Sequence, residues 1–264
     1  MMYLSSSPKA IFDASQKQQQ QYQALVVKSN TAIRKARYSL SVNQQTLLCY
    51  LIYRLQDSDT HETVITFDIK TFCDFIGKSD DNYTRIKADL ETIANKSWWI
   101  QNDDGTEILM RFFNTVHTSK RSGKVYIKFH EDILPYLQGL KREFTPYKLW
   151  YTMTMRSEYS IRLYELLKSV SKKSSWVFEI DYLKKIFMCE HYQQFCHFRQ
   201  RVLEPAVAEI NAKTDINVSY EKFKEGRTYK SIEFYIEHKS DTDRLNVDRA
   251  IRAELDGQTS LFVE

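Results

Sequence analysis

The segment 193–201 concentrates side chains that hydrogen-bond readily to other molecules. It reads Gln-Gln-Phe-Cys-His-Phe-Arg-Gln-Arg and contains no carboxylate. If the segment continues as a helix, Phe195, Phe198 and Val202 face a core, and a step of about 100° per residue turns the polar side chains outward. The outward set is Gln193, Gln194, His197, Gln200 and Arg201, with Arg199 at its flank.

These residue types can read the edges of DNA bases. Arginine pairs with guanine through two hydrogen bonds, glutamine pairs with adenine in the same way, and histidine donates or accepts. A solvated helix face without a partner is the alternative interpretation, although such faces are more often rich in Glu and Lys. We therefore expect a helix that enters the major groove of DNA.

A basic hairpin is expected to follow this helix. One β-prone run carries Val218 and Tyr220 in alternation, and the next carries Ile232 and Phe234. Gly226, between the two runs, is a turn signal. Positive side chains near the turn can contact phosphates, which position a protein on DNA. They are Lys222, Lys224, Arg227 and Lys230.

The elements that would hold such a helix occur twice in the chain. Phe67-Asp68-Ile69 is matched 111 positions later by Phe178-Glu179-Ile180, and Phe72 is matched by Leu183 at the same offset. The apolar residues of the next helix recur at an offset of 112, which a turn one residue longer explains. Agreement in both order and spacing indicates an internal duplication.

The first copy has the element order of a winged helix. A Ser41–Gln44 capping box begins a helix over 42–56, and a β-prone run at 63–69 follows. A short helix stopped by Gly77 and a helix over 82–96 come next, followed by three β-prone stretches at 98–101, 108–118 and 125–129. Hairpins in this place are the wings of winged-helix proteins.

The corresponding surface of the first copy is poorer in side chains that pair with bases. Its helix presents Thr84 and Arg85, and its last hairpin turn presents Lys120, Arg121 and Lys124. We expect this unit to contact the DNA backbone or to form a protein interface. A purely structural scaffold is the alternative.

The pattern predicts an α+β fold of two tandem winged-helix domains with flexible terminal tails. The 264 residues suit two units of about 100 to 120 residues. We expect a mobile polar arm over 1–25, domain 1 over 26–140, domain 2 over 150–238 and an acidic tail over 239–264. Residues 1–240 carry 35 Lys and Arg against 28 Asp and Glu, and such a basic body suits an anionic polymer as partner.

Several segments resemble a known family, the plasmid replication initiator (Rep) proteins, whose tandem winged helices bind direct repeats called iterons. The likeness covers about residues 25–237. It rests on Lys28-Ser29-Asn30, Ala36-Arg37-Tyr38-Ser39-Leu40, Tyr159-Ser160, Leu163-Tyr164, Leu166-Leu167, Phe195, Phe198-Arg199-Gln200-Arg201-Val202-Leu203, Glu209-Ile210-Asn211 and the hairpin from Tyr220 to Arg227.

The resemblance implies a protein whose monomer binds iterons and helps to open a replication origin. It implies that a dimer joined through domain 1 represses its own gene, and that the replicative helicase and the initiator of the host are candidate partners. By position, it transfers DNA reading to Arg199 and Arg201. Pro205 lacks a backbone N–H and should kink or end the reading helix.

The expected geometry also predicts the size of the DNA site. Two reading helices in successive major grooves lie about 34 Å apart, which corresponds to a double-stranded site of about 20 base pairs.

No catalytic residue, cofactor or metal site is expected. The six histidines form no His-hydrophobic-His pair, which a rolling-circle nicking enzyme needs, and the chain has no Gly-x4-Gly-Lys phosphate loop. Cys189, His191, Cys196 and His197 are close in sequence, but their spacing fits none of the usual zinc patterns. The four cysteines suit reduced thiols, and without a signal peptide or an apolar run of 18 residues we expect a cytoplasmic protein with no membrane segment.

The C-terminal tail carries a further motif. Gln258-Thr259-Ser260-Leu261-Phe262 resembles the Gln-x-Ser-Leu-Phe peptide by which bacterial replication proteins dock on the DNA polymerase sliding clamp. The candidate contacts are Gln258, Leu261 and Phe262, because an unstructured tail can place an apolar pair in a pocket. A chance match, or a tail helix packed on the body, is the alternative.

Two other functions remain open at this point. A dimeric transcriptional repressor would use the same two units on a palindromic operator, but a clamp-binding tail would serve no purpose in it. A nicking enzyme would cut supercoiled origin DNA in the presence of Mg²⁺ or Mn²⁺.

Overall fold

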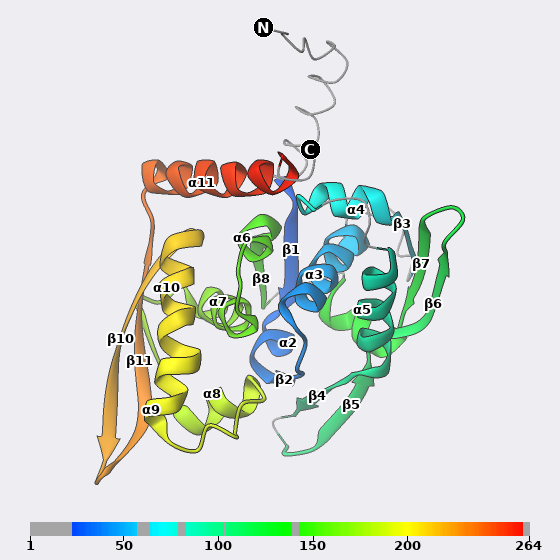
Figure 1. The fold of residues 1–264 in the computed structure, drawn as a ribbon. Helices are drawn as coiled ribbons and strands as arrows, with labels where there is room; N and C mark the ends of the chain where they lie inside the picture. The colour runs from blue at the N-terminus through cyan, green and yellow to red at the C-terminus, as the bar shows by residue number, and fades with distance from the viewer. Residues whose placement is uncertain (1–22, 57–63, 79–82, 103, 139–142, 261–264) are drawn as a thin grey trace, which may run out of the picture.

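The computed structural model describes residues 23–56, 64–78, 83–102, 104–138 and 143–260, and Figure 1 shows their arrangement. The first half of the chain forms β1 (Leu25–Ser29), α2 (Asn30–Lys35), β2 (Ala36–Arg37), α3 (Val42–Gln56), β3 (Val64–Asp68), α4 (Ile69–Phe75), α5 (Tyr83–Asn95), β4 (Ser97–Gln101), β5 (Glu107–Arg111), β6 (Phe113–Ser119), β7 (Lys124–Phe129), the 3-10 helix η1 (Glu131–Tyr136), β8 (Phe144–Lys148) and α6 (Leu149–Met153).

The second half forms a related set of elements. They are α7 (Glu158–Val170), β9 (Ser175–Glu179), α8 (Ile180–Ile186), α9 (Phe195–Phe198), the π-helical turn η2 (Arg199–Leu203), α10 (Glu204–Lys213), β10 (Ile216–Glu225), β11 (Thr228–His238) and α11 (Asp241–Ser260). Two winged-helix units are thus present, as predicted.

The duplication extends to the sheets and to the ends of helices. In both units the strand before the helix-turn-helix pairs with the second strand of the wing, giving the antiparallel orders β3-β7-β6 and β9-β11-β10. Helices α4 and α8 both end in a left-handed residue, Gly77 with φ 71° and Met188 with φ 54°. In each case the next N–H bonds back by five residues at 2.9 Å, from Lys78 to the Cys73 carbonyl and from Cys189 to the Lys184 carbonyl.

The β-prone stretch 108–118 is not one strand. It forms β5 and β6, which belong to two different sheets, because β5 pairs with β4 and β6 pairs with β7. The chain changes sheets at Phe112 and Phe113, which are 1% and 4% exposed. A strand sends successive side chains to opposite faces, so two consecutive buried residues require a change of direction there.

The two units share one core. Strand β1, at the start of the first unit, pairs with β8, which precedes the second. Nine of the 13 residues of α7 are buried, and this helix contacts α2, α3, β8 and α10. Its burial on more than one face follows from its apolar side chains, among which Arg162 and Glu165 are buried as an ion pair.

The C-terminal segment differs from the prediction of a flexible tail. Residues 241–260 form α11, which buries Ile251 and Leu255 against the body. Lys148 on β8 donates to the Asp248 carboxylate at 3.1 Å, and Lys213 on α10 donates to Glu254 at 3.2 Å. Figure 1 shows α11 crossing from the second unit toward α4 of the first. The sequence signal for this packing was the pair of apolar residues at 251 and 255, one helical turn apart. The acidic composition of the segment concealed it.

Within the described residues, no helix combines the length and the apolar character needed to cross a membrane.

Candidate nucleic-acid interface

The predicted reading helix is longer than the sequence indicated. Helices α9 and α10 are joined by the π-helical turn η2, in which the Glu204 N–H bonds to the Arg199 carbonyl, five residues back. Pro205 therefore follows a point where the hydrogen-bond ladder has already shifted, and its missing N–H is tolerated in the first turn of α10. Of the two outcomes expected at Pro205, a kink or an end, the end is wrong, because the helix continues to Lys213.

At the centre of this helix, the side chains that the spacing predicted to face outward do so. His197, Gln200 and Arg201 are exposed, while Phe198 and Val202 are buried. The exposed side chains of Gln200 and Arg201 have no hydrogen-bond or ion-pair partner among the described residues. Their donors and acceptors are therefore available to a ligand.

The loop before the helix holds two more of the predicted contacts. Gln193 and Gln194 are exposed, and their backbone is fixed from both sides. Lys184 donates to the Gln193 carbonyl at 3.0 Å, and the Phe198 N–H donates to the Gln194 carbonyl at 3.2 Å. The glutamine side chains thus project from a loop whose backbone is held in place.

Arg199 differs from the other predicted contacts. It is half-buried, and its Nε lies 3.3 Å from the Glu204 carboxylate, beside Tyr220 on β10. Because the guanidinium already faces a carboxylate, Arg199 is better placed to join the helix to the wing than to read a base.

The second wing is attached to the start of the reading helix. The Tyr229 ring packs on Phe195 with centroids 4.8 Å apart, and the ammonium groups of Lys222 and Lys224 lie 5.3 and 4.8 Å from the Tyr229 centroid. Both lysines are therefore on the side of the wing that faces the reading helix. The attraction between an ammonium group and the face of an aromatic ring orients each lysine and stabilises that orientation slightly.

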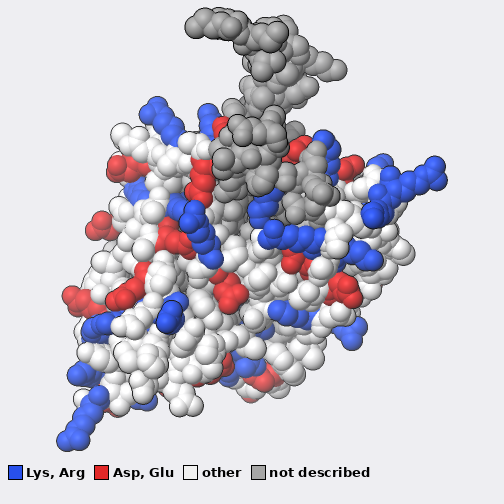
Figure 2. Space-filling model, viewed as in Figure 1, with Lys and Arg blue, Asp and Glu red and all other residues white. Residues whose placement is uncertain are grey.

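The tip and the outer flank of the wing hold the other two basic residues. Arg227 is exposed in the turn that Gly226 forms with φ 61°. Lys230 is exposed as well, and its ammonium lies 4.0 Å from Asp181 on α8. In Figure 2 basic side chains mark this tip at the lower left of the molecule.

In the first unit, the predicted contacts lie on the equivalent elements. Thr84 and Arg85 are exposed on α5, and Lys120, Arg121 and Lys124 are exposed at the β6–β7 turn. Figure 1 shows α5 and the α9–α10 helix running in opposite directions, with the two wings on opposite outer sides. The structure therefore gathers the predicted residues into two groups, one for each wing and reading helix.

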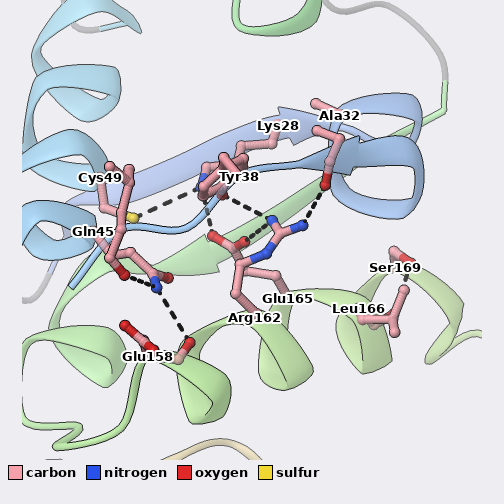
Figure 3. Close-up of polar contacts among 12 residues, drawn as sticks. Lys28, Ala32, Tyr38, Gln45, Cys49, Glu158, Arg162, Glu165, Leu166 and Ser169 are labelled. Atoms are coloured by element: carbon pink, nitrogen blue, oxygen red, sulfur yellow. Dashed lines mark hydrogen bonds and ion pairs between the residues drawn. The ribbon is translucent and has the colours of Figure 1, made fainter. Parts of the chain in front are cut away.

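A buried polar network joins β1 to α7, and sequence reasoning missed it (Figure 3). Lys28 on β1 and Arg162 on α7 both bond to Glu165, at 2.6 and 3.3 Å. Arg162 also donates to the Tyr38 hydroxyl and to the Ala36 carbonyl, both at 2.8 Å. A lysine directly after Val26 and Val27 in a mostly apolar strand was the available signal.

Charge pairing decides the protonation state of this network. Burial raises the pKa of Glu165, but the positive charges of Lys28 and Arg162 outweigh burial and hold that pKa below its usual value. Glu165 is therefore an anion shared between two cations, one on β1 and one on α7.

The cysteine and histidine residues considered for zinc do not converge. Cys189 is buried and Cys196 is exposed, and all four cysteines of the chain are free thiols. No group of three or more His, Cys, Asp or Glu side chains in the described parts of the chain is arranged to hold a metal ion.

The fold and this surface define a protein with two tandem winged helices, one of which presents an exposed reading helix beside a basic wing. Two family models match the chain, "Initiator Replication protein, WH1" over residues 25–168 and "Initiator Rep protein, WH2" over residues 179–236. The chain belongs to this family of replication initiator proteins, and the predicted membership is confirmed.

Individual relatives agree with the family match. The chain is 26% identical over 226 residues to an Escherichia coli "Replication initiation protein", covering 81% of this chain and 70% of the relative. It is 29% identical over 164 residues to the Escherichia coli "PI protein", covering 54% of this chain and about half, 52%, of that protein. A crystal structure of the Pi initiator protein in complex with iteron DNA superimposes with a TM-score of 0.68 at 20% identity, covering 83% of this chain and 99% of that one. At this identity the likeness establishes the fold.

Proposed function

We propose that this protein initiates plasmid replication by binding tandem double-stranded DNA repeats, or iterons, at an origin. The observation that carries the proposal is the exposed, carboxylate-free start of the reading helix, with Gln200 and Arg201 unpartnered within the described structure beside a basic wing. A protein of the same fold has been crystallised with iteron DNA, which supports this assignment.

In this proposal each surface group has a defined role. The α9–α10 helix enters a major groove, where Gln193, Gln194, His197, Gln200 and Arg201 meet base edges. Lys222, Lys224, Arg227 and Lys230 contact phosphates along the wing. The first unit adds Thr84, Arg85, Lys120, Arg121 and Lys124 one groove away, which gives a site of about 20 base pairs.

Origin opening in this proposal uses the free energy of DNA binding. Bending the bound DNA concentrates strain at flexible AT-rich steps next to the site, which lowers the cost of separating the strands. No strand cleavage is needed. We expect supercoiled origin DNA to stay uncut when it is incubated with the protein and Mg²⁺ or Mn²⁺.

The central test is selection of binding sites from a random duplex library, followed by titrations with the winning site. Wild type should recover a motif of about 20 base pairs. Arg201→Ala should lose about 1 to 3 kcal/mol at one base position and relax the preference there. Arg252→Ala, an exposed arginine on α11, is the matched control and should bind as wild type does.

Recovery of no motif, with general binding that merely weakens as salt rises, would contradict the assignment of the reading helix.

The proposed autoregulatory dimer joins two copies through domain 1. Its best candidate surface is the sheet β2-β4-β5, in which β5 is an end strand. Trp99 and Leu109 lie opposite each other in the β4–β5 register and are 38% and 51% exposed. Leu109→Lys should shift the protein toward monomer in analytical ultracentrifugation without loss of single-site DNA binding. A dimer of unchanged strength would exclude this surface.

Host proteins complete the proposal. The replicative helicase, the host initiator and the sliding clamp are the expected partners. Of the clamp motif, Gln258 falls on the last turns of α11, and Leu261 and Phe262 lie outside the described residues. Leu261→Ala with Phe262→Ala should abolish retention of the purified clamp on the immobilised protein, and unchanged retention would remove the clamp from the list of partners.

A further inference from the structure

The sheet of the second unit turns an acidic face outward. Its core-facing positions, such as Phe234, alternate with outward positions on β9, β10 and β11. Four of the outward positions are glutamates, and none of the outward positions over 175–179, 217–223 and 231–237 is Lys or Arg. We define the acidic face as Glu179, Glu221, Glu233 and Glu237 around Val177 and Tyr235.

The equivalent sheet of the first unit turns a basic face outward. We define the basic face as His117, Tyr126 and Lys128 on β6 and β7, whereas Lys124, at the turn end of β7, belongs to the proposed DNA-contacting group. Asp68 at its edge is occupied as the N-cap of α4, where it accepts from the Lys70 N–H. Each face has an exposed tyrosine, Tyr126 at 41% and Tyr235 at 37%.

The two faces occupy the same position in the duplicated fold. Tyr126 pairs across the sheet with Thr66 and with His117. In the second unit the same place is taken by Glu233, which pairs with Val177 and with Glu221. A matching backbone thus carries a histidine and a tyrosine in one unit and two carboxylates in the other.

The faces point away from the molecule on opposite sides. Figure 1 places β10 and β11 at one side and β6 and β7 at the other, with both reading helices between them. DNA that engages both reading helices would therefore run from one face toward the other.

We propose that copies bound to neighbouring repeats contact each other head to tail, the acidic face of one against the basic face of the next. This inference rests on the proposed binding of tandem repeats. A heterologous contact that does not close on itself extends along an open array, as direct repeats require, whereas a two-fold dimer contact does not. Complementary charge also sets the register and disfavours contact between like faces.

The spacing of DNA grooves is compatible with such a contact. Within one copy the two reading helices lie one helical turn, about 34 Å, apart along the DNA. If repeats recur about every two turns, the gap between neighbouring copies is again one turn. Adjacent units of different copies are then as close along the DNA as the two units of one copy.

The test compares duplexes that carry one or two copies of the selected site. Wild type should fill the second site about tenfold more tightly than the first, within the usual range for coupling between sites. Glu221→Lys and Lys128→Glu, each alone, should reduce the coupling to near onefold and leave one-site affinity unchanged. Glu131→Lys, an exposed charge reversal at a residue outside both faces, is the matched control and should keep the coupling.

Combining Glu221→Lys with Lys128→Glu restores opposite charges at each contact and should recover the coupling. Adding about five base pairs between the sites, half a helical turn, should abolish it because the second copy moves to the other side of the DNA.

The outcomes separate this inference from the proposed function. Absence of binding to a single site would overturn the proposed function itself. Normal single-site binding with no coupling in wild type would overturn the head-to-tail contact and leave the proposed function intact. Coupling that survives both charge reversals, or that the combined variant fails to recover, would also overturn the contact and direct the search to a basic host protein for the acidic face.

Discussion

At the scale of single residues, the chain uses charge in two different ways. Arg201 and Gln200 are left exposed on the reading helix, whereas Lys28, Arg162 and Glu165 are withdrawn from solvent between β1 and α7. An exposed arginine is available for a base, while a buried ion network fixes the geometry of the elements that carry it. The binding surface therefore depends on residues that never touch DNA.

Glu165→Gln should destabilise the protein by about 3 kcal/mol, because it leaves two buried cations without their shared anion. Urea unfolding followed by circular dichroism measures the loss. Glu131→Gln, at an exposed position, is the control and should change little. A loss below about 1 kcal/mol would mean that water or other groups compensate the cations.

The same substitution should change the response to acid. The pKa of Glu165 is lower in the folded protein than its ordinary value, so its contribution to stability is present above the unfolded pKa and is lost as pH falls through the folded pKa. Between pH 6 and pH 3, wild type should lose more unfolding free energy than Glu165→Gln does. Parallel pH profiles for the two proteins would contradict the assignment.

At the scale of elements, the equivalent ends of α4 and α8 show that one backbone conformation accepts different residues. Gly77 and Met188 both take a left-handed conformation, but their surroundings differ. A Cβ at Gly77 would lie 2.8 Å from the Leu255 carbonyl oxygen on α11, whereas Met188 is 41% exposed. Glycine is required in the first unit both for its conformation and for the approach of α11.

Gly77→Ala should therefore destabilise the protein by more than about 1 kcal/mol, and Met188→Gly should stabilise it by about 0.5 to 1 kcal/mol. The second value is the relief of left-handed strain less the added entropy of a glycine in the unfolded chain. Guanidinium unfolding of the two variants beside wild type gives both differences. A stabilising Gly77→Ala would show that α11 does not approach the α4 end as closely as described.

At the scale of the whole molecule, α11 links three parts of the structure. It contacts β8 through Asp248, α10 through Glu254 and the end of α4 through the Leu255 backbone. The matched family segments end at residue 236, so this helix lies beyond them. Together with the buried network, the contacts of α11 hold the two reading helices in a fixed relative position.

Asp248→Ala should loosen α11 because it leaves Lys148 without this carboxylate partner, at a local cost of about 1 to 3 kcal/mol. Hydrogen exchange measured by mass spectrometry should show faster exchange over 241–256, and faster tryptic cleavage at Arg249 and Arg252 should accompany it. Asp256→Ala, at an exposed position of the same helix, should exchange at the wild-type rate. Equal exchange in both variants would show that α11 is held by its apolar contacts instead.

The sequence by itself determined the features that depend on short-range spacing. The repeat at 111 positions, the Ser41–Gln44 capping box and the outward set from Gln193 to Arg201 all follow from periodicity and local hydrogen bonding, which neighbouring residues settle among themselves. The tertiary structure alone decided the change of sheet at Phe112, the packing of α11, the pairing of Arg199 with Glu204 and the meeting of Lys28 with Glu165. Lys28 and Glu165 are 137 positions apart, and the energy of such a contact depends on how distant elements fold onto one another, which no local pattern encodes.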